Sequence, residues 1–392
     1  MPAAWSVLWI LALLPAAAVA LWPLLVGRLL ARSRAARREV AASVSVLVPV
    51  CGDEPGLAAG LRSVLAAEWP GAELEVVVIA GQRTDPALAV AWQACAGAGE
   101  RARVIVAGGA GDDAPGKAAQ IAAGVAVSHG SWIVMLDSDA RLPDLGWVRR
   151  FCAPLADPGI GLVSCVPVCR DLQRPAARLL AATIEPDLLG SFAMLDAAGW
   201  LALANGSCLA IRREMLQRCR GLEAMRGRLL MDTALARAVR RTGGQVCVHD
   251  EALPVDSGRI GWRAAWEQSH RWQVAILRGL PLPAALGFAW LRSATPLALA
   301  LALFGGSWGA WAGAAAIGLR LGVAWSLRRR LGTRLTPVDL TAQVAADLVA
   351  GLTWIVAALD PHVMWRGRRW RVRGGATVEL PRSAARVRPR PT

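Results

Sequence analysis

The sequence contains no tyrosine and only one lysine, Lys117, although its 392 residues carry a formal net charge of +15. Arginine therefore supplies nearly all of the positive charge. Because arginine can replace lysine at most exposed positions, the one lysine either lies where a compact ammonium group is needed or remains on the surface by chance. Composition leaves both interpretations of Lys117 open.

Closely spaced cysteine pairs are also missing. There are eight cysteines but no C-x-x-C pair, and the closest two are Cys165 and Cys169. Structural zinc sites and thioredoxin-like redox sites usually contain such pairs. The spacing indicates neither a zinc site nor a disulfide framework, and it favours reduced thiols in contact with the cytosol.

Hydrophobic residues are abundant but interrupted. They make up 55% of the chain, and the mean hydropathy is +0.40. This composition is too apolar for an ordinary soluble enzyme and too interrupted for a protein built only of membrane spans. We expect one globular domain combined with several membrane segments.

The first apolar run extends from Trp5 to Val26 without a charged residue. At about 1.5 Å per residue it can cross a hydrocarbon core of about 30 Å. A signal peptide is the alternative, because Ala18-Val19-Ala20 resembles a cleavage site, but the run continues past these residues. Five arginines follow it: Arg28, Arg32, Arg34, Arg37 and Arg38. The positive-inside rule then predicts an anchor over residues 1–31 and a cytosolic domain over residues 32–280.

Apolar segments return after Pro281. They extend over Leu282–Leu303, Phe304–Ala324 and Val338–Leu359, and each contains a charged residue: Arg292, Arg320, or Asp339 with Asp347. Two or three membrane segments are therefore predicted over residues 281–360. The arginine-rich tail over residues 361–392 is expected to contact anionic lipid from the cytosol.

The middle of the chain alternates short β-branched runs with helical patterns. Strands are predicted at Val44–Val50, Leu74–Ala80, Val104–Ala107 and Trp132–Leu136, with an amphipathic helix after Gly56. This alternation predicts an α/β fold, with a mainly parallel sheet between helices and with ligands beyond the carboxyl ends of the strands. The missing G-x-G-x-x-G after the first strand argues against a dinucleotide-binding Rossmann domain.

Acidic side chains follow three of the predicted strands. They are Asp53 with Glu54, Asp85, and the tripeptide Asp137-Ser138-Asp139. Two carboxylates at positions i and i+2 beyond a strand can both reach a hard cation such as Mg²⁺ or Mn²⁺, which would neutralise a departing diphosphate. The structural alternative for the tripeptide is a solvated strand end.

An ordered set of motifs resembles glycosyltransferase family 2. The set is Gly52-Asp53-Glu54-Pro55-Gly56-Leu57, Asp85-Pro86-Ala87, Gly116-Lys117, Asp137-Ser138-Asp139, Asn205-Gly206-Ser207-Cys208, Asp232 and Gln268-Ser269-His270-Arg271-Trp272. Within that family the sequence is most similar to ceramide glucosyltransferases and to bacterial hopanoid-biosynthesis glycosyltransferases, over about residues 44 to 280. The resemblance implies a GT-A-like domain that moves one sugar, with inversion, from a donor such as UDP-glucose or UDP-N-acetylglucosamine to a lipid hydroxyl.

The resemblance also implies roles for individual residues. Asp85 would contact the nucleotide base, and Lys117 would face the diphosphate. Asp137 and Asp139 would bind the ribose-diphosphate and the divalent metal, with Asp139 as the direct ligand. Asp232 would be the general base that deprotonates the acceptor hydroxyl. The structural alternatives are a turn-forming aspartate, a solvated lysine and a first-turn helix charge, respectively.

One position departs from the family pattern. Family members commonly carry an acidic residue immediately before the catalytic aspartate, whereas this chain has Met231 before Asp232. The base is kept, but the role of its acidic neighbour in orienting the acceptor or the sugar is put in doubt.

Gln268, Arg271 and Trp272 fall on one face of a helix predicted to begin near residue 260. Arg271 would pair with the diphosphate, and Trp272 would flank the acceptor or the sugar. The alternative is an interfacial helix in which Trp262, Trp266 and Trp272 contact lipid. Both interpretations are compatible.

Other classes of protein fit less well. A nucleic-acid-binding protein would suit the charge of +15, but the arginines cluster beside the apolar segments, so no nucleic-acid partner is expected. A transporter would need more spans. A processive polysaccharide synthase, which shares Q-x-x-R-W, remains the alternative. We expect a multi-pass protein of a bacterial-type inner (cell) membrane, with a cytoplasmic catalytic domain and with a nucleotide sugar and a lipid as partners.

Overall fold

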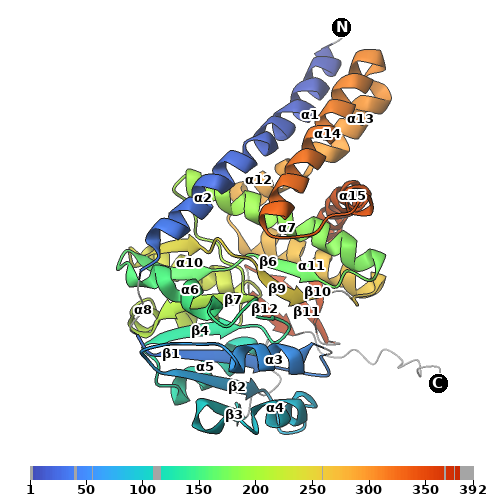
Figure 1. Cartoon of the computed structure of the whole chain (residues 1–392). Helices are drawn as coiled ribbons and strands as arrows, with labels where there is room; N and C mark the ends of the chain where they lie inside the picture. Colours follow the sequence, from blue (N-terminus) through green and yellow to red (C-terminus); the bar gives the residue numbers. More distant parts are fainter. Residues whose placement is uncertain are drawn as a thin grey trace, which may run out of the picture.

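A seven-stranded sheet forms the centre of the protein (Figure 1). The computed structural model describes residues 3–38, 42–54, 56–108, 116–257, 259–365, 368–374 and 376–379. The strand order is β3-β2-β1-β4-β7-β5-β8. The strands are β1 (Val44–Val50), β2 (Leu74–Ala80), β3 (Ala102–Val106), β4 (Trp132–Leu136), β5 (Ile160–Ser164), β7 (Cys208–Arg212) and β8 (Gln245–Val248).

The first four strands of this order are parallel, as predicted, and β7 runs antiparallel to both of its neighbours. Three predicted strands are confirmed with the expected bounds, and the predicted strand at Val104 belongs to β3. Every residue of β1 and β4 is buried, because helices cover both faces of the sheet. The sheet is therefore mixed and mainly parallel.

Successive residues of β1 face different helices. Val46 and Val48 lie in one apolar cluster with α3 (Leu57–Leu65) and α4 (Ala87–Cys95), whereas Leu47 lies in another with α5 (Lys117–Val127). The remaining helices of this part are α6 (Trp147–Cys152), α7 (Pro175–Ala197), α8 (Arg213–Arg218), α9 (Gly221–Met225), α10 (Met231–Arg241) and α11 (Trp262–Gly279). Helices α10 and α11 confirm the two helices predicted in the second half of this region.

Two smaller sheets complete the globular part. Strand β6 (Pro167–Arg170) pairs with β9 (Leu253–Asp256), and β10 (His362–Trp365), β11 (Arg368–Arg373) and β12 (Ala376–Glu379) form a three-stranded sheet. Trp370 of β11 packs in an apolar cluster with Val274 of α11 and with Leu229. The chain beyond the last long helix therefore returns to the globular part of the molecule.

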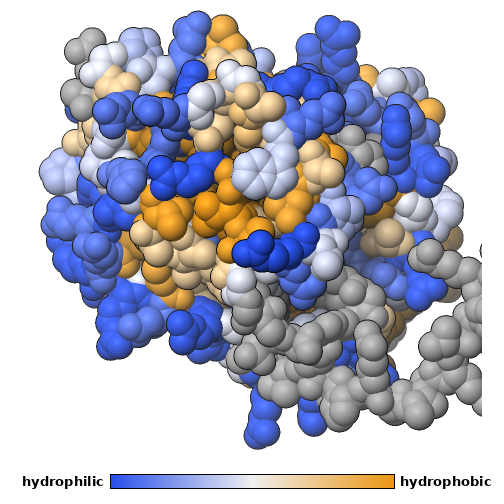
Figure 2. All heavy atoms as spheres, turned by 90° about the horizontal axis from the view of Figure 1, so that it is seen from below, coloured by the Kyte–Doolittle hydropathy of each residue, from blue (hydrophilic) through white to orange (hydrophobic). Residues whose placement is uncertain are grey.

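Apolar helices extend away from the sheet (Figure 1). They are α1 (Ala3–Ala20), α2 (Trp22–Ala36), α12 (Leu282–Arg292), α13 (Ala294–Phe304), α14 (Gly306–Arg330) and α15 (Pro337–Leu359). Three described segments, Trp9–Ala36, Gly306–Arg330 and Pro337–Leu359, are long and apolar enough to cross a membrane, and α12 with α13, bent by 44°, would be a fourth. The opposite face of the molecule, seen in Figure 2, is hydrophilic around a smaller hydrophobic centre.

The charged residues inside these apolar helices pair with α7 and with one another. Arg320 of α14 donates to Asp187 of α7 at 2.7 Å and to Asp347 of α15 at 2.8 Å. Arg292 of α12 lies 3.7 Å from Asp187, and Thr295 of α13 donates to Asp347 at 2.5 Å. Two arginines therefore meet two aspartates, so that the buried charges balance. Arg292, Arg320 and Asp347, which interrupt the predicted spans, therefore belong to this network.

A second buried pair strengthens the same junction. Arg328, near the end of α14, donates to Glu185 of α7 at 2.7 Å, and Glu185 also accepts the backbone N–H of Cys169 at 3.0 Å. Because Cys169 belongs to β6, this contact links the apolar helices to the globular part through α7.

We predict that Asp187→Ala strongly destabilises the protein. The substitution leaves Arg320 and Arg292 buried with one aspartate between them, and an uncompensated buried charge costs about 3–5 kcal/mol. Tryptophan fluorescence of the detergent-solubilised protein during heating measures the effect. As a control, Glu223→Ala removes an exposed ion pair with Arg220 and costs about 1 kcal/mol or less. Equal unfolding temperatures for the two variants would contradict the role of Asp187.

Candidate active site

Four chain segments meet at the carboxyl end of β4. The backbone N–H of Asp137, directly after β4, donates to the carbonyl of Ser207 at 2.9 Å, just before β7 begins. The antiparallel pairing of β7 with β4 is what brings these two loops to one edge of the sheet. Lys117 begins α5, and Asp232 lies in the first turn of α10.

Lys117 lies at the centre of this meeting point. Its ammonium group forms an ion pair with Asp137 Oδ1 and donates to the carbonyl of Gly206 at 2.9 Å. Burial alone would lower the pKa of Lys117, but Asp137, followed by Asp232 and Asp139, outweighs burial and raises it. The side chain is 20% exposed. Lys117 is therefore a charged and partly buried group, and the alternative of a solvated surface lysine is wrong.

Asp232 also lies close to Gly206. A Cβ added to Gly206 would lie 3.1 Å from Asp232 Oδ2 and 3.5 Å from Lys117 Nζ. Burial raises the pKa of Asp232 to about 6, although backbone N–H groups of Thr233 and Gly206 and the charge of Lys117 oppose the shift. The carboxylate is ionised at neutral pH and binds a proton more strongly than an exposed aspartate does. This is the property that a general base needs.

Met231 points away from this carboxylate. Its side chain is buried in the apolar cluster that contains Leu235 and Val239 of the same helix. The residue that replaces the usual acidic neighbour therefore packs the core, and it brings no charge to the site.

The Asp137-Ser138-Asp139 segment collects negative charge. Burial, then Asp137 and then Glu54 raise the pKa of Asp139 to about 8. Asp139 Oδ1 is buried and has no hydrogen-bond partner among the described residues. Glu54 accepts a hydrogen bond from Ser138 Oγ, which holds the loop after β1 against this segment.

These oxygens suit a hard divalent cation, since a cation would satisfy the unpartnered Asp139 oxygen and reduce the repulsion between the carboxylates. The described residues contain no group of three or more His, Cys, Asp or Glu side chains placed to hold a metal ion. Oxygen atoms of a bound ligand, such as a diphosphate, would therefore have to complete the coordination.

Asp85 connects two backbone segments at the same edge of the sheet. Its Oδ1 accepts the backbone N–H of Gly52 at 2.8 Å and that of Ala87 at 2.9 Å. The carboxylate thus joins the loop after β1 to the start of α4. The turn-forming interpretation of Asp85 is confirmed, and contact with a nucleotide base stays a prediction.

Two residues of this region were not singled out from the sequence. The buried Gln120 of α5 donates to the carbonyls of Val50 and Ile79, at the ends of β1 and β2. Asp256 of β9 donates its backbone N–H to the carbonyl of Asp139 at 2.9 Å. The polar Gln120, three residues after Lys117 in an otherwise apolar helix, was a signal that could have been used.

The Q-x-x-R-W residues form a separate group on α11. Arg271 donates to Gln268 Oε1, and both side chains line a cavity of about 320 Å³ with Ile260, Ala264 and Met364, among others. None of the described residues that line it belongs to the group around Lys117. Trp272 is half-buried and is not among the lining residues that the structure describes. The structure brings Gln268 and Arg271 together, as the helical spacing predicts.

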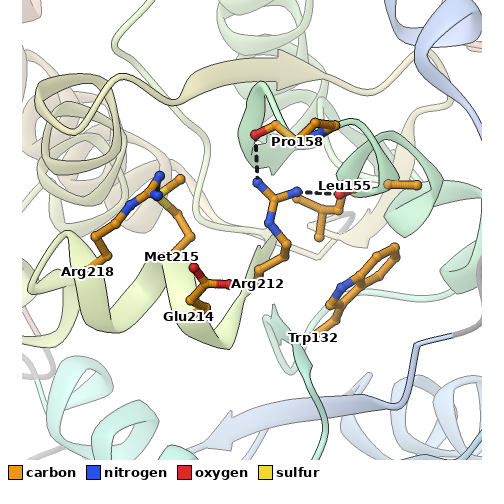
Figure 3. A pocket seen from close by; sticks show the side chains of 8 residues that line it. Trp132, Leu155, Pro158, Arg212, Glu214, Met215 and Arg218 are labelled. Atoms are coloured by element: carbon orange, nitrogen blue, oxygen red, sulfur yellow. Dashed lines mark hydrogen bonds between the residues drawn. The ribbon is translucent and has the colours of Figure 1, made fainter.

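A second cavity, of about 350 Å³, lies at the opposite end of β4 (Figure 3). Trp132, the first residue of β4, lines it together with Arg212, the last residue of β7. Arg212 donates to the carbonyls of Leu155 and Pro158, as the dashed lines in Figure 3 mark. This guanidinium therefore holds the loop before β5, and the cavity lies away from Asp137.

The comparison with protein families settles the class of enzyme. Residues 7–378 match the model of glycosyl transferase family 21. The chain belongs to this family. It is a glycosyltransferase, as the motifs predicted, and the more specific resemblance to family 2 and to hopanoid-biosynthesis enzymes stays a prediction. No curated protein sequence matches the chain significantly.

One solved structure supports the fold, and a second shows a weaker likeness. A mannosyltransferase of Pyrobaculum calidifontis, in complex with GDP-mannose and Mn²⁺, is 20% identical, with a TM-score of 0.50 over 89% of this chain and 99% of that chain. Glucosyl-3-phosphoglycerate synthase of Mycobacterium tuberculosis, in complex with Mn²⁺, UDP and phosphoglyceric acid, is 21% identical, with a TM-score of 0.39 over 70% and 81% of the two chains. The predicted GT-A-like fold with apolar helices at both ends is confirmed.

We predict that Gly206→Ala reduces sugar transfer about tenfold or more while the protein stays folded. The added Cβ lies 3.1 Å from Asp232 Oδ2 and forces this carboxylate to move by a few tenths of an ångström, and displacements of this kind are costly in an active site. Gly97→Ala is the matched control, since a Cβ there meets no atom within 4 Å. Full activity of Gly206→Ala would show that the contacts around Gly206 are not needed.

Proposed function

We propose that this glycosyltransferase moves a single sugar from a nucleotide diphosphate sugar to a hydroxyl group of a membrane lipid, with inversion at the anomeric carbon. The observation that carries the proposal is the convergence of Lys117, Asp137 and Asp232 around Gly206 at the carboxyl end of β4. Ligands of parallel sheets bind at such edges. A cation, an acidic pair and a raised-pKa carboxylate are the groups that transfer from a diphosphate requires.

The donor diphosphate lies beside Lys117 and the acidic segment. Asp139 and Asp137 hold a divalent ion, Mg²⁺ or Mn²⁺, which supplies charge neutralisation for the leaving diphosphate when it is bound. The unpartnered Asp139 Oδ1 supports this assignment. Lys117 contributes a second positive charge, and Asp85, after β2, lies at the end of the sheet where the base would be held.

Asp232 removes the proton from the acceptor hydroxyl as its oxygen attacks the anomeric carbon. The nucleotide diphosphate leaves from the opposite side, so that an α-linked donor gives a β-glycoside and no covalent intermediate forms with the enzyme. The pKa of about 6 supports this role, because the carboxylate is ionised at neutral pH and still accepts a proton readily. Arg271 assists the leaving diphosphate, and Gln268 and Trp272 border the acceptor.

A lipid acceptor is supported by the surroundings of α11. Trp262 and Trp266 of this helix are 63% and 38% exposed, and Leu282 at the start of α12 is 65% exposed. Exposed tryptophan and leucine side chains next to apolar helices suit the boundary between membrane and water. An acceptor with its hydroxyl at this boundary reaches the enzyme without leaving the membrane, and the catalytic domain lies in the cytoplasm.

The decisive experiment incubates membranes that contain the full chain with radiolabelled UDP-glucose, UDP-N-acetylglucosamine or GDP-mannose and with ceramide, hopanoid, diacylglycerol or polyprenol lipids. GDP-mannose is included because the Pyrobaculum enzyme of the same fold binds it. We expect one labelled glycolipid with one added sugar, lost with EDTA and restored by Mn²⁺ or Mg²⁺. Alkali treatment separates stable ceramide or hopanoid products from diacylglycerol products.

The same experiment separates the alternatives. A labelled polymer that stays at the origin of the chromatogram would favour a processive polysaccharide synthase. Transfer to water or to a soluble sugar alone would overturn the lipid acceptor, and transfer that continues in EDTA would overturn the role of the metal.

We predict that Asp232→Asn lowers transfer by about 100-fold or more. Asparagine keeps the size of the side chain and its hydrogen bond to the first turn of α10, so that the unfolding temperature should change little. If Asp232 served only the start of the helix, the asparagine variant would keep its activity. Substantial transfer by this variant would therefore remove Asp232 from the role of base.

The pH dependence of the wild-type enzyme provides a second readout of the same residue. Asp232 acts only when deprotonated, and burial raises its pKa above the usual value. With the divalent ion at saturating concentration, so that Asp139 stays ionised, the ratio kcat/KM should therefore be at its plateau above pH 7 and fall as the pH decreases through about 6. The residual activity of Asp232→Asn should lack this inflection.

A further inference from the structure

Helix α15 is long and apolar enough to cross a membrane, yet both of its ends are bound to the globular part. At its start, Asp339 accepts from Arg178 of α7 at 2.8 Å. At its end, the carbonyl of Ala358 accepts from Arg278 of α11 at 3.0 Å. The 23 residues of α15 extend over about 35 Å, which exceeds the thickness of a hydrocarbon core. A crossing helix would have one of these ends on the far side.

Helices α13 and α14 form a hairpin. The middle of α15 contacts the end of this hairpin that is nearest the globular part. Asp347 meets Thr295, the second residue of α13, and Arg320, which lies past the middle of α14 on the side of the globular part. Thr353, nearly two turns further, bonds to Ser269 of α11 at 3.2 Å. In Figure 1, α15 is seen end-on, whereas α1, α13 and α14 extend upwards in the plane of the picture. The helix therefore runs across the hairpin at its base.

The two faces of α15 have opposite character. One face is buried against the protein and carries the polar residues Asp339, Gln343, Asp347 and Thr353. The other face is exposed along the whole helix and is apolar: Val338, Leu348, Leu352, Ile355 and Leu359 are 58, 43, 52, 55 and 82% exposed. A continuous apolar strip of this kind is unfavourable in water, and it marks a surface that contacts lipid or protein.

We infer that α15 does not cross the membrane but lies in its cytosolic leaflet, with this apolar face against the acyl chains. The lipid bilayer is the occupant that fits, because the α13–α14 hairpin that α15 crosses carries exposed apolar side chains from its tip down to Leu319, next to Arg320. Leu303, Phe304, Trp308 and Trp311 of that hairpin are all exposed. The inference rests on the proposed membrane association of the enzyme. It gives three crossings, by the N-terminal helices, by α12 with α13, and by α14.

The placement of α15 in the cytosolic leaflet affects which lipid acceptors can reach the enzyme. Helix α11, which carries Gln268 and Arg271, packs on the buried face of α15 through Ser269 and Thr353. A helix embedded in the cytosolic leaflet thus forms the support of the Q-x-x-R-W helix. It sets the depth at which a lipid hydroxyl meets the active site, so that acceptors with a hydroxyl near the headgroup boundary are selected.

Spin labels measure the depth of α15 directly. Single cysteines replace Val338, Leu348 and Leu359 in the full chain, which is reconstituted in phosphatidylcholine/phosphatidylglycerol vesicles, and relaxation by oxygen and by a water-soluble nickel chelate gives the depth of each nitroxide. We expect three similar depths of about 5–10 Å below the headgroups. A crossing helix would place Leu348 about 15 Å deeper than both ends, which would overturn the inference.

Ala315, which is exposed on α14 and lies five residues before Arg320 towards the tip of the hairpin, is the control position after replacement by cysteine. Its label should lie deeper than all three labels of α15. If the label at Ala315 is also accessible to nickel, the membrane insertion that the proposed function assumes has failed, whereas a deep label at Ala315 with nickel-accessible α15 labels overturns only the placement of α15. A Leu348 label shielded from both oxygen and nickel would mean that protein covers the strip, and it would also overturn the inference. Wild-type protein corrects for labelling of the native cysteines.

A second measurement does not depend on depth. Arg369→Cys in β11 and Glu100→Cys in the globular part are labelled with a membrane-impermeant maleimide in sealed inverted vesicles and in right-side-out vesicles. We expect both positions to react from the same side. Reaction from opposite sides would mean that α15 crosses the membrane.

Discussion

The ammonium group of Lys117 joins the chain segments on which the active site depends. It binds the carboxylate after β4 and the carbonyl of Gly206 before β7, while its charge acts on Asp232 at the start of α10. These contacts hold three acidic side chains, Asp137, Asp139 and Asp232, near one another. The sequence keeps a lysine here although arginine is used almost everywhere else, and a compact ammonium fits between a carboxylate and a carbonyl where a planar guanidinium would not.

A second constraint acts between the globular part and the apolar helices. Helix α7 belongs to the catalytic half, yet its Glu185 and Asp187 are the counter-charges of arginines in α12 and α14. The position of the candidate active site relative to the apolar helices is therefore set by ion pairs that are shielded from water and salt. Such a junction is rigid, which suits the proposed transfer from a soluble donor to a membrane lipid.

Local patterns in the sequence were sufficient for the strands and for most of the acidic edge. The runs Val44–Val50, Leu74–Ala80 and Trp132–Leu136 are apolar except for Ser45 and Glu75, so that their strand character needs no tertiary information. The charges after them lie at one edge because parallel strands require it. The fold class followed from the alternation of strands and helices, and the enzyme class from the ordered motifs.

Other features depend on tertiary contacts and could not be predicted from local patterns in the sequence. The antiparallel β7, which brings Gly206 between Lys117 and Asp232, cannot be distinguished from a parallel strand by its short apolar sequence. The number of crossings was left at two or three after residue 281, because the composition of α15 is that of a span and only its tethered ends show otherwise. Asp187, the partner that Arg292 and Arg320 share, is more than 100 residues away from both, beyond the reach of local periodicity.

The balance of the buried charges also limits how this protein can evolve. Asp187, Arg292, Arg320 and Asp347 sum to zero, and each borders at least one of the others. A lineage that loses one of them carries an uncompensated ion until a second change restores neutrality. Divergence at these four sites therefore proceeds in pairs, and descendants should differ by exchanging a whole ion pair for apolar side chains.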